Sequence, residues 1–118
     1  MSITSLQIGQ NKISIFDVPD YSNYESVTWN PSTSTTIKDD TFIAPFDGWF
    51  EYQARGANQS AFISIRFTRN NSDSLWQVTR NDTELHTGLF KVLKNDSILV
   101  RSFSMSTEKA YIKFYHTK

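Results

Sequence analysis

Apolar and polar side chains alternate most regularly in the run Ala61–Thr68. Its apolar members are Ala61, Ile63, Ile65 and Phe67. Successive side chains of a β-strand point to opposite faces of the sheet, so this run predicts a strand with one face in the core. The other face is expected to meet water or a partner.

Shorter runs of the same kind recur along the chain, separated by segments rich in Asn, Asp, Ser, Gly and Pro. They predict two short strands around Gly9–Lys12 and further strands at Glu25–Trp29, Thr36–Lys38, Trp49–Arg55, Leu75–Thr79, Leu89–Leu93, Ile98–Phe103 and Ala110–Tyr115. The intervening segments predict loops or turns, among them Asp17–Asn23, Asp39–Asp40, Asn70–Asp73 and Ser104–Lys109. No window has helical periodicity. Short strands at close spacing predict an all-β sandwich or barrel.

The rest of the chain is organised around the stretch Thr41–Tyr52. An apolar run enters it, Pro45 ends that run, and an alternating strand leaves after Gly48. Proline removes a donor from the β-ladder and presets a turn, and glycine permits a positive φ. We therefore expect a corner here, with Gly48 in a backbone conformation that a side chain disfavours.

The length, the net charge and the apolar runs of the chain limit the classes of function that we expect. The 118 residues predict a single domain over 1–118, long enough to bury roughly two-thirds of its unfolded surface. Twelve basic and twelve acidic residues give zero net charge, so we expect no nucleic-acid partner. No apolar run approaches the ~20 residues of a membrane span, and the N-terminus has no secretory signal pattern, so neither membrane insertion nor secretion is expected.

The chain offers few residues for catalysis or metal binding. It has no Cys, and its two histidines, His86 and His116, lie far apart in the sequence. Catalysis, metal binding and a cofactor are therefore not expected, although sequence order does not exclude a triad assembled in space. The acidic loop residues match calcium ligands or turn formers, and we favour turn formers: Asp17, Asp20, Glu25, Asp39 and Asp40. The Asn-x-Ser/Thr triplets, such as Asn58–Ser60, are likewise typical of turns.

Three segments together resemble a known family. Phe42–Trp49 is similar to the Phe-x-Ala/Val-Pro-x-x-Gly-aromatic corner of the complement-head and tumour-necrosis-factor-like jelly rolls, especially the short versions at the tips of bacteriophage tail and head fibres. Gly88–Val100 is similar to that family's strand, Lys-rich turn and strand, with Asn95-Asp96 in place of the usual Gly-Asp. Asn tolerates the left-handed φ of such a turn. Tyr111–His116 is similar to its aromatic last strand, whereas residues 1–40 match no motif of the family.

The resemblance implies a jelly-roll β-sandwich and a viral structural protein, most of all of a bacteriophage. The chain would be made in the host cytoplasm and displayed on the virion surface as a fibre tip, a capsid decoration or a receptor-binding module. The expected partners are other virion proteins and a host-surface glycan or protein receptor.

Several predicted strands carry large groups on both faces, and a monomer would leave them in water. The resembling families are trimers. We therefore predict a homotrimer with contacts from Phe62, Phe103, Tyr111 and Tyr115.

Two alternatives remain open. The first is a non-catalytic carbohydrate-binding module of a cellular protein, in which aromatic residues stack on sugar rings. The residues predicted for that contact are Trp29, Tyr21, Tyr24 and Trp76. Packing in the core or between subunits is the more common role of such side chains. The second alternative is an enzyme of cupin type, which the missing His cluster disfavours.

Overall fold

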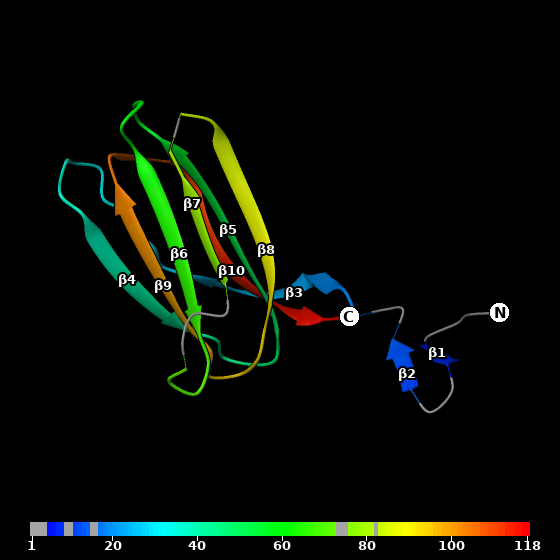
Figure 1. The fold of residues 1–118 in the computed structure, drawn as a ribbon. Coiled ribbons are helices and arrows are strands. Elements are labelled where there is room, and N and C mark those ends of the chain that lie inside the picture. Colours follow the sequence, from blue (N-terminus) through cyan, green and yellow to red (C-terminus); the bar gives the residue numbers. More distant parts are fainter. Residues whose placement is uncertain (1–4, 9–10, 15–16, 73–75, 82) are drawn as a thin grey trace.

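The computed structural model describes residues 5–8, 11–14, 17–72, 76–81 and 83–118, with the backbone alone at 5–8, 11–14 and 76–80. The described part is all-β and contains no helix, and so none that could span a bilayer. Its strands are β1 (Ser5–Ile8), β2 (Asn11–Ser14), β3 (Pro19–Val27), β4 (Lys38–Ile43), β5 (Gly48–Gly56), β6 (Phe62–Thr68), β7 (Trp76–Arg80), β8 (Leu85–Val92), β9 (Ser97–Phe103) and β10 (Met105–Thr117) (Figure 1).

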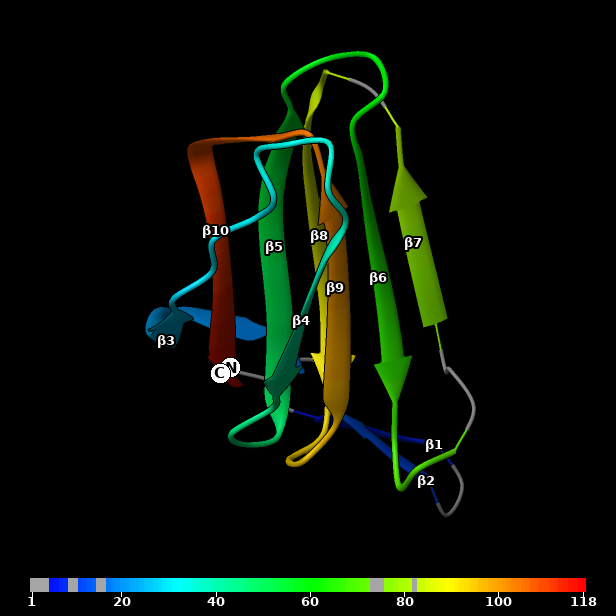
Figure 2. The same cartoon turned by 90° about the vertical axis from the view of Figure 1, so that its left-hand side faces the viewer.

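Eight of these strands form two four-stranded antiparallel sheets, with strand orders β3-β10-β5-β8 and β4-β9-β6-β7. Figure 2 shows the two sheets lying face to face as a sandwich. Strands taken alternately from the two halves of the chain sit side by side in each sheet, which is the double Greek-key order of a jelly roll. The predicted jelly-roll sandwich is confirmed.

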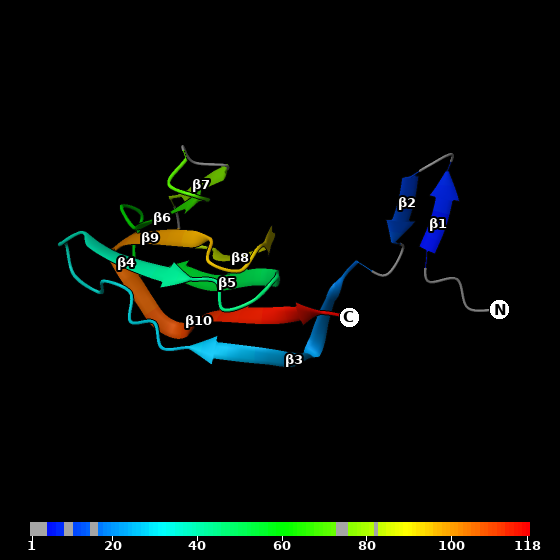
Figure 3. The ribbon, with the colours of Figure 1, turned by 90° about the horizontal axis from the view of Figure 1, so that it is seen from below.

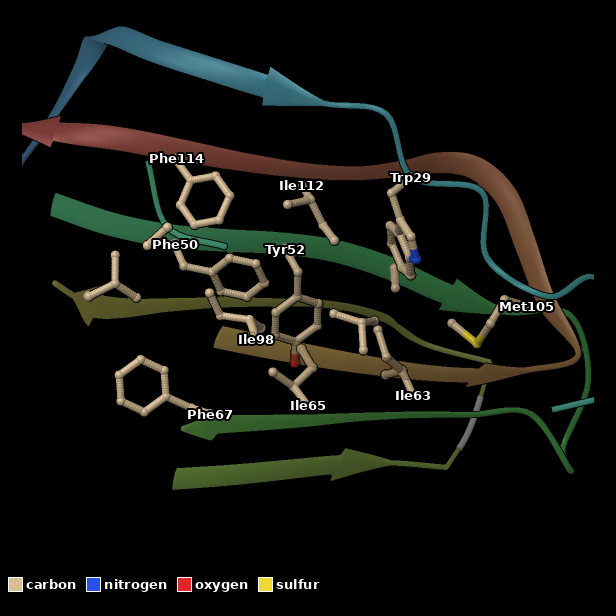
Figure 4. Packing of buried hydrophobic residues seen from close by; sticks show 14 of the residues in the cluster. Trp29, Phe50, Tyr52, Ile63, Ile65, Phe67, Ile98, Met105, Ile112 and Phe114 are labelled. Carbon is tan, nitrogen blue, oxygen red and sulfur yellow. The ribbon is translucent and has the colours of Figure 1, made fainter. Parts of the chain in front are cut away.

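The core lies between the sheets and follows the alternation of the sequence. β5 alternates between buried and half-buried positions along its whole length, and β6 buries Ile63, Ile65 and Phe67. Figure 4 shows these side chains meeting Phe50, Tyr52, Ile112 and Phe114 of the facing sheet. Gly88 lies opposite Tyr52 in the ladder, and a Cβ there would come within 2.4 Å of the Tyr52 ring, so the aromatic ring occupies the space of the missing side chain.

The predicted corner lies between β4 and β5. The Ala44 N–H donates to the carbonyl of Asp96 at 2.9 Å, and the Asn95 N–H donates to the carbonyl of Ala44 at 2.8 Å. The expectation of a left-handed Gly48 is wrong, because its φ lies outside that region. Glycine is needed there for space: a Cβ would lie 2.1 Å from the carbonyl oxygen of Tyr115 on β10.

Asp96 is buried at this end of the sandwich and holds the turn between β8 and β9. Its Oδ1 and Oδ2 accept from Nε and Nη2 of Arg69, both at 2.8 Å, and Oδ2 also accepts from the Leu93 N–H at 2.6 Å. Asn95 has a φ of 75°, which confirms the left-handed conformation expected where Asn-Asp replaces Gly-Asp. We call these contacts of Asp96 the carboxylate clasp.

Three predicted turns lie within strands instead. β3 begins at Pro19, the first residue of a strand, where the missing N–H costs little. Its turn-forming residues make a bulge, in which Asp20 Oδ1 accepts from the Ser22 N–H at 3.1 Å. β4 runs through Asp39-Asp40, and β10 begins at Met105 and accommodates the predicted turn residues Ser106–Lys109 in a bulge.

β1 and β2 form the predicted pair of short N-terminal strands and are antiparallel to each other. Figure 3 shows this hairpin beside the sandwich, on the side where the C-terminus lies. The eight sandwich strands run from Pro19 to Thr117, and the extension of one domain over 1–118 stays a prediction.

Candidate functional site

The outer surface of the β3-β10-β5-β8 sheet carries a group of tyrosines. Because Ile112 and Phe114 of β10 point into the core, the residues that alternate with them, Tyr111 and Tyr115, point outward. β3 lies beside β10 at the sheet edge and adds Tyr21 and Tyr24. Together with Glu51 and Lys113, these four tyrosines form what we call the tyrosine face.

Glu51 links the two tyrosines of β10. Its Oε1 accepts from both phenol groups, at 2.8 Å from Tyr111 and 2.8 Å from Tyr115. Burial and the hydrogen bond to the Glu51 carboxylate raise the pKa of Tyr111 to about 12, and the same causes raise the pKa of Tyr115 further. Both phenols therefore stay neutral donors at physiological pH.

Cation–π contacts complete the tyrosine face. The Lys113 Nζ lies 4.8 Å from the ring centre of Tyr24 and 4.5 Å from that of Tyr111. The Tyr21 ring meets the edge of Tyr115 with ring centres 5.0 Å apart. The face thus presents aromatic surface with an ammonium group over it, which is chemistry suited to contact with another protein surface.

The residues predicted to contact a glycan do not share one surface. Tyr21 and Tyr24 are 59% and 46% exposed, so their rings are accessible. Trp29 is only 7% exposed because its ring fills the core between the sheets, so its assignment to a glycan contact is wrong (Figure 4). The side chain of Trp76 lies outside the described residues, and its role stays a prediction.

The residues predicted for the trimer contact lie on two surfaces. Phe62 and Phe103 stack with ring centres 5.5 Å apart on the outside of the β4-β9-β6-β7 sheet, away from the tyrosine face. A closed ring of three copies needs two contact surfaces inclined at about 120°, whereas the outer faces of a sandwich point in opposite directions. Tyr115 is only 4% exposed and is covered within its own chain by Tyr21 and Tyr24. The four predicted residues therefore do not form one patch, and the trimer contact stays a prediction.

Two of the five acidic residues considered as calcium ligands form hydrogen-bonded pairs with basic side chains. Asp17 pairs with Lys91, and Asp39 pairs with Arg101 through two hydrogen bonds of 2.8 and 3.0 Å. Over the described ranges, no group of three His, Cys, Asp or Glu side chains could hold a metal ion. His116 stacks on Phe46 with ring centres 3.6 Å apart, which is a packing role.

A shallow hollow lies on the outer surface of the β4-β9-β6-β7 sheet. Its lining residues, which we call the arginine hollow, are Ser64, Arg66, Leu99 and Arg101. They form a two-by-two block across neighbouring strands, because Ser64 lies opposite Arg101 and Arg66 lies opposite Leu99. The sequence alternation placed Arg66 outward, but only the register between β6 and β9 brings it beside Arg101.

The chain matches no family model and no curated protein. Among solved structures, it is similar to one titled "CBM4 structure and function", with 11% sequence identity and a TM-score of 0.37. That comparison covers 80% of this chain and 67% of the other. A likeness of this size carries no argument about function.

Proposed function

We propose that the chain is a viral structural protein, a bacteriophage virion component that assembles as a homotrimer through the tyrosine face. It would serve as a fibre tip, a capsid decoration or a host-receptor-binding module on the virion surface, beside other virion proteins. The proposal follows the resemblance of three sequence segments to phage fibre tips of the jelly-roll type.

One observation carries this proposal: the three matching segments meet at one end of the sandwich. The corner of Phe42–Trp49 hydrogen-bonds to the turn of Gly88–Val100 through Ala44 and Asp96. It also packs against the last strand, since Phe46 stacks on His116. Segments up to about 70 positions apart in the sequence therefore act as one structural unit, which supports reading them as one family pattern and not as separate coincidences.

The tyrosine face supports assembly with further copies. Tyr21 and Tyr24 leave large aromatic surface in water, and Lys113 lies over the aromatic rings. Exposed aromatic patches are common in protein interfaces and are seldom left open in soluble monomers. In a threefold ring, the same head-to-tail contact repeats and closes, so the tyrosine face of every copy meets a second surface of its neighbour.

Two measurements test the proposal. Mass spectrometry of virions purified from the phage's host should detect the chain as a particle component, and its absence from the particles would contradict a virion role. Light scattering coupled to size exclusion should give three times the chain mass of 13.6 kDa, whereas a monomer mass at micromolar concentration would contradict the trimer.

A matched pair of variants locates the contact. Tyr111→Ser on the tyrosine face should shift the mass toward monomer, and Phe62→Ser on the opposite face should leave the trimer intact. Circular dichroism on both variants separates loss of the contact from loss of the fold. A trimer that survives Tyr111→Ser and dissociates with Phe62→Ser would place the contact on the other sheet.

The carbohydrate-binding alternative keeps support from Tyr21 and Tyr24, whose rings are accessible in a single chain. It predicts a monomer that binds neutral oligosaccharides and loses that binding in Tyr24→Ala. The trimer proposal predicts that the same rings are covered by a neighbouring copy.

A further inference from the structure

We propose that the arginine hollow binds the carboxylate of an acidic sugar, with Arg66 as its principal ligand. This inference deepens the proposed function and rests on it in one respect: if the tyrosine face is covered in the trimer, the opposite sheet is the one left free to meet a host surface.

The charges around the hollow leave one cation without a partner. Arg101 is held by Asp39, which occupies Nε and Nη2 of its guanidinium. Within the described part of the chain, no carboxylate pairs with Arg66, whose side chain is exposed. The block of Arg66, Arg101 and Asp39 therefore carries one net positive charge, which a ligand with a single negative charge would neutralise.

The size of the hollow is suited to a carboxylate group. It encloses about 50 Å³, whereas a single water needs roughly 10–15 Å³ on the same kind of measure. The planar guanidinium of an arginine matches the two oxygens of a carboxylate and binds them through two parallel hydrogen bonds. A whole sugar ring does not fit in this space, so the ring must rest beside the hollow.

An aromatic surface lies where the ring would rest. Phe62 and Phe103 are opposite each other in the ladder, two residues along each strand from Ser64 and Arg101, and so occupy the next row of the same face. Their rings stack with an angle of only 11° between the planes. Leu99 adds apolar surface inside the hollow. Apolar C–H faces of a sugar can pack against such groups while its carboxylate reaches Arg66, whereas an acidic peptide side chain offers only a short methylene stem.

The test uses a pair of ligands that differ in the proposed anchor alone. Methyl β-glucuronide carries a carboxylate where methyl β-glucoside carries a CH₂OH group. In an NMR titration of the ¹⁵N-labelled full chain, the glucuronide should shift amides of β6 and β9 with a Kd on the order of millimolar, as expected for a small and shallow site. The glucoside should produce no saturable shifts there.

Three variants should change glucuronide binding in three different ways. Arg66→Gln should weaken glucuronide binding about tenfold or more, because it removes a charge-assisted anchor. Asp39→Asn should strengthen binding several-fold, because it frees Arg101 and raises the net charge of the block. Lys94→Gln, which removes an exposed positive charge on the turn between β8 and β9, should leave the Kd unchanged.

Equal binding of the two glycosides, or weaker glucuronide binding by Asp39→Asn, would overturn the proposal. Acetate or a polyglutamate peptide binding as tightly as the glucuronide would overturn the assignment to a sugar. Because Asp39→Asn predicts a gain, an unfolded variant cannot imitate the expected result. A monomeric chain that still binds glucuronide through Arg66 would reject the trimer proposal and leave this site in place.

Discussion

The carboxylate clasp gives the sharpest stability prediction. Asp96 is 2% exposed and accepts three hydrogen bonds, two from Arg69 and one from the backbone N–H of Leu93. We expect Asp96→Asn to destabilise the fold, because the amide group presents N–H donors to the donors of Arg69. Asp39→Asn is a matched control, since Asp39 also binds an arginine through two hydrogen bonds but is 42% exposed.

Asp96→Asn should cost more stability than Asp39→Asn, because water can replace the hydrogen bonds of the exposed Asp39 and cannot replace those of the buried Asp96. A hydrogen bond to a charged group is worth about 1.5–3 kcal/mol when its loss leaves a buried group unsatisfied. Arg69 is 33% exposed and recovers part of its solvation, so we expect Asp96→Asn to cost about 2–3 kcal/mol. The exposed pair at Asp39 should be worth only about 0.2–1 kcal/mol.

Urea denaturation followed by tryptophan fluorescence measures both variants. All samples must have the same protein concentration, because assembly would make the apparent stability depend on it. The expected loss corresponds to a fall in Tm of roughly 8–12 °C for Asp96→Asn and a few degrees at most for Asp39→Asn. Equal midpoints for the two variants would refute the argument that burial of the clasp, and not the ion pair alone, provides the stability.

Two other features give predictions of their own. Gly48→Ala should lower the free energy of unfolding by about 3 kcal/mol or more, because its Cβ would meet the backbone oxygen of Tyr115. Gly56→Ala in the same strand is the control and should cost less. Equal losses of stability in denaturant titrations would contradict the close approach at Gly48. The pKa of Tyr111 is raised to about 12 in the folded chain, so its contribution to stability is fully present below pH 10 and lost as the pH rises to about 12. In an absorbance titration at 295 nm, Tyr111→Phe should therefore remove a phenol that ionises late, well above pH 10. If the late part of the titration curve is the same in both proteins, Tyr111 is not a late-ionising group.

The sequence predicted the fold well because the fold depends on alternation and on local turns. β5 and β6 follow the predicted face pattern residue by residue. The turn at Asn70-Asn71 lies where it was expected, with both residues at positive φ. Two of the strand boundaries that differ lie at bulges, where turn-forming residues such as Asp20 and Lys109 remain inside a strand. The third, at Asp39-Asp40, lies in the regular ladder between β4 and β9. Composition alone cannot distinguish a bulge from a turn, because both use the same residues.

The candidate sites were less predictable because they depend on pairing between distant strands. Arg66 and Arg101 are 35 positions apart and share a hollow only through the register of β6 and β9. Asp96 looks like a turn residue in the sequence, and its burial depends on Arg69 reaching it from the end of another strand. Trp29 ends the predicted strand Glu25–Trp29, whereas β3 ends at Val27, and the sequence pattern did not show that its ring fills the core.

The tyrosine face and the arginine hollow lie on different sheets, so assembly and ligand binding would use separate surfaces. The segments that resemble phage fibre tips include the corner, Asp96 of the carboxylate clasp and Tyr111, and so cover the end of the sandwich and part of the tyrosine face. They contain neither Arg66 nor Arg101. A pattern that specifies the fold and the proposed assembly face can therefore be retained while the exposed face of the β4-β9-β6-β7 sheet changes. On this reasoning, exchanging residues of the arginine hollow should alter ligand binding without altering the mass of the assembly, whereas exchanges in the tyrosine face should do the reverse.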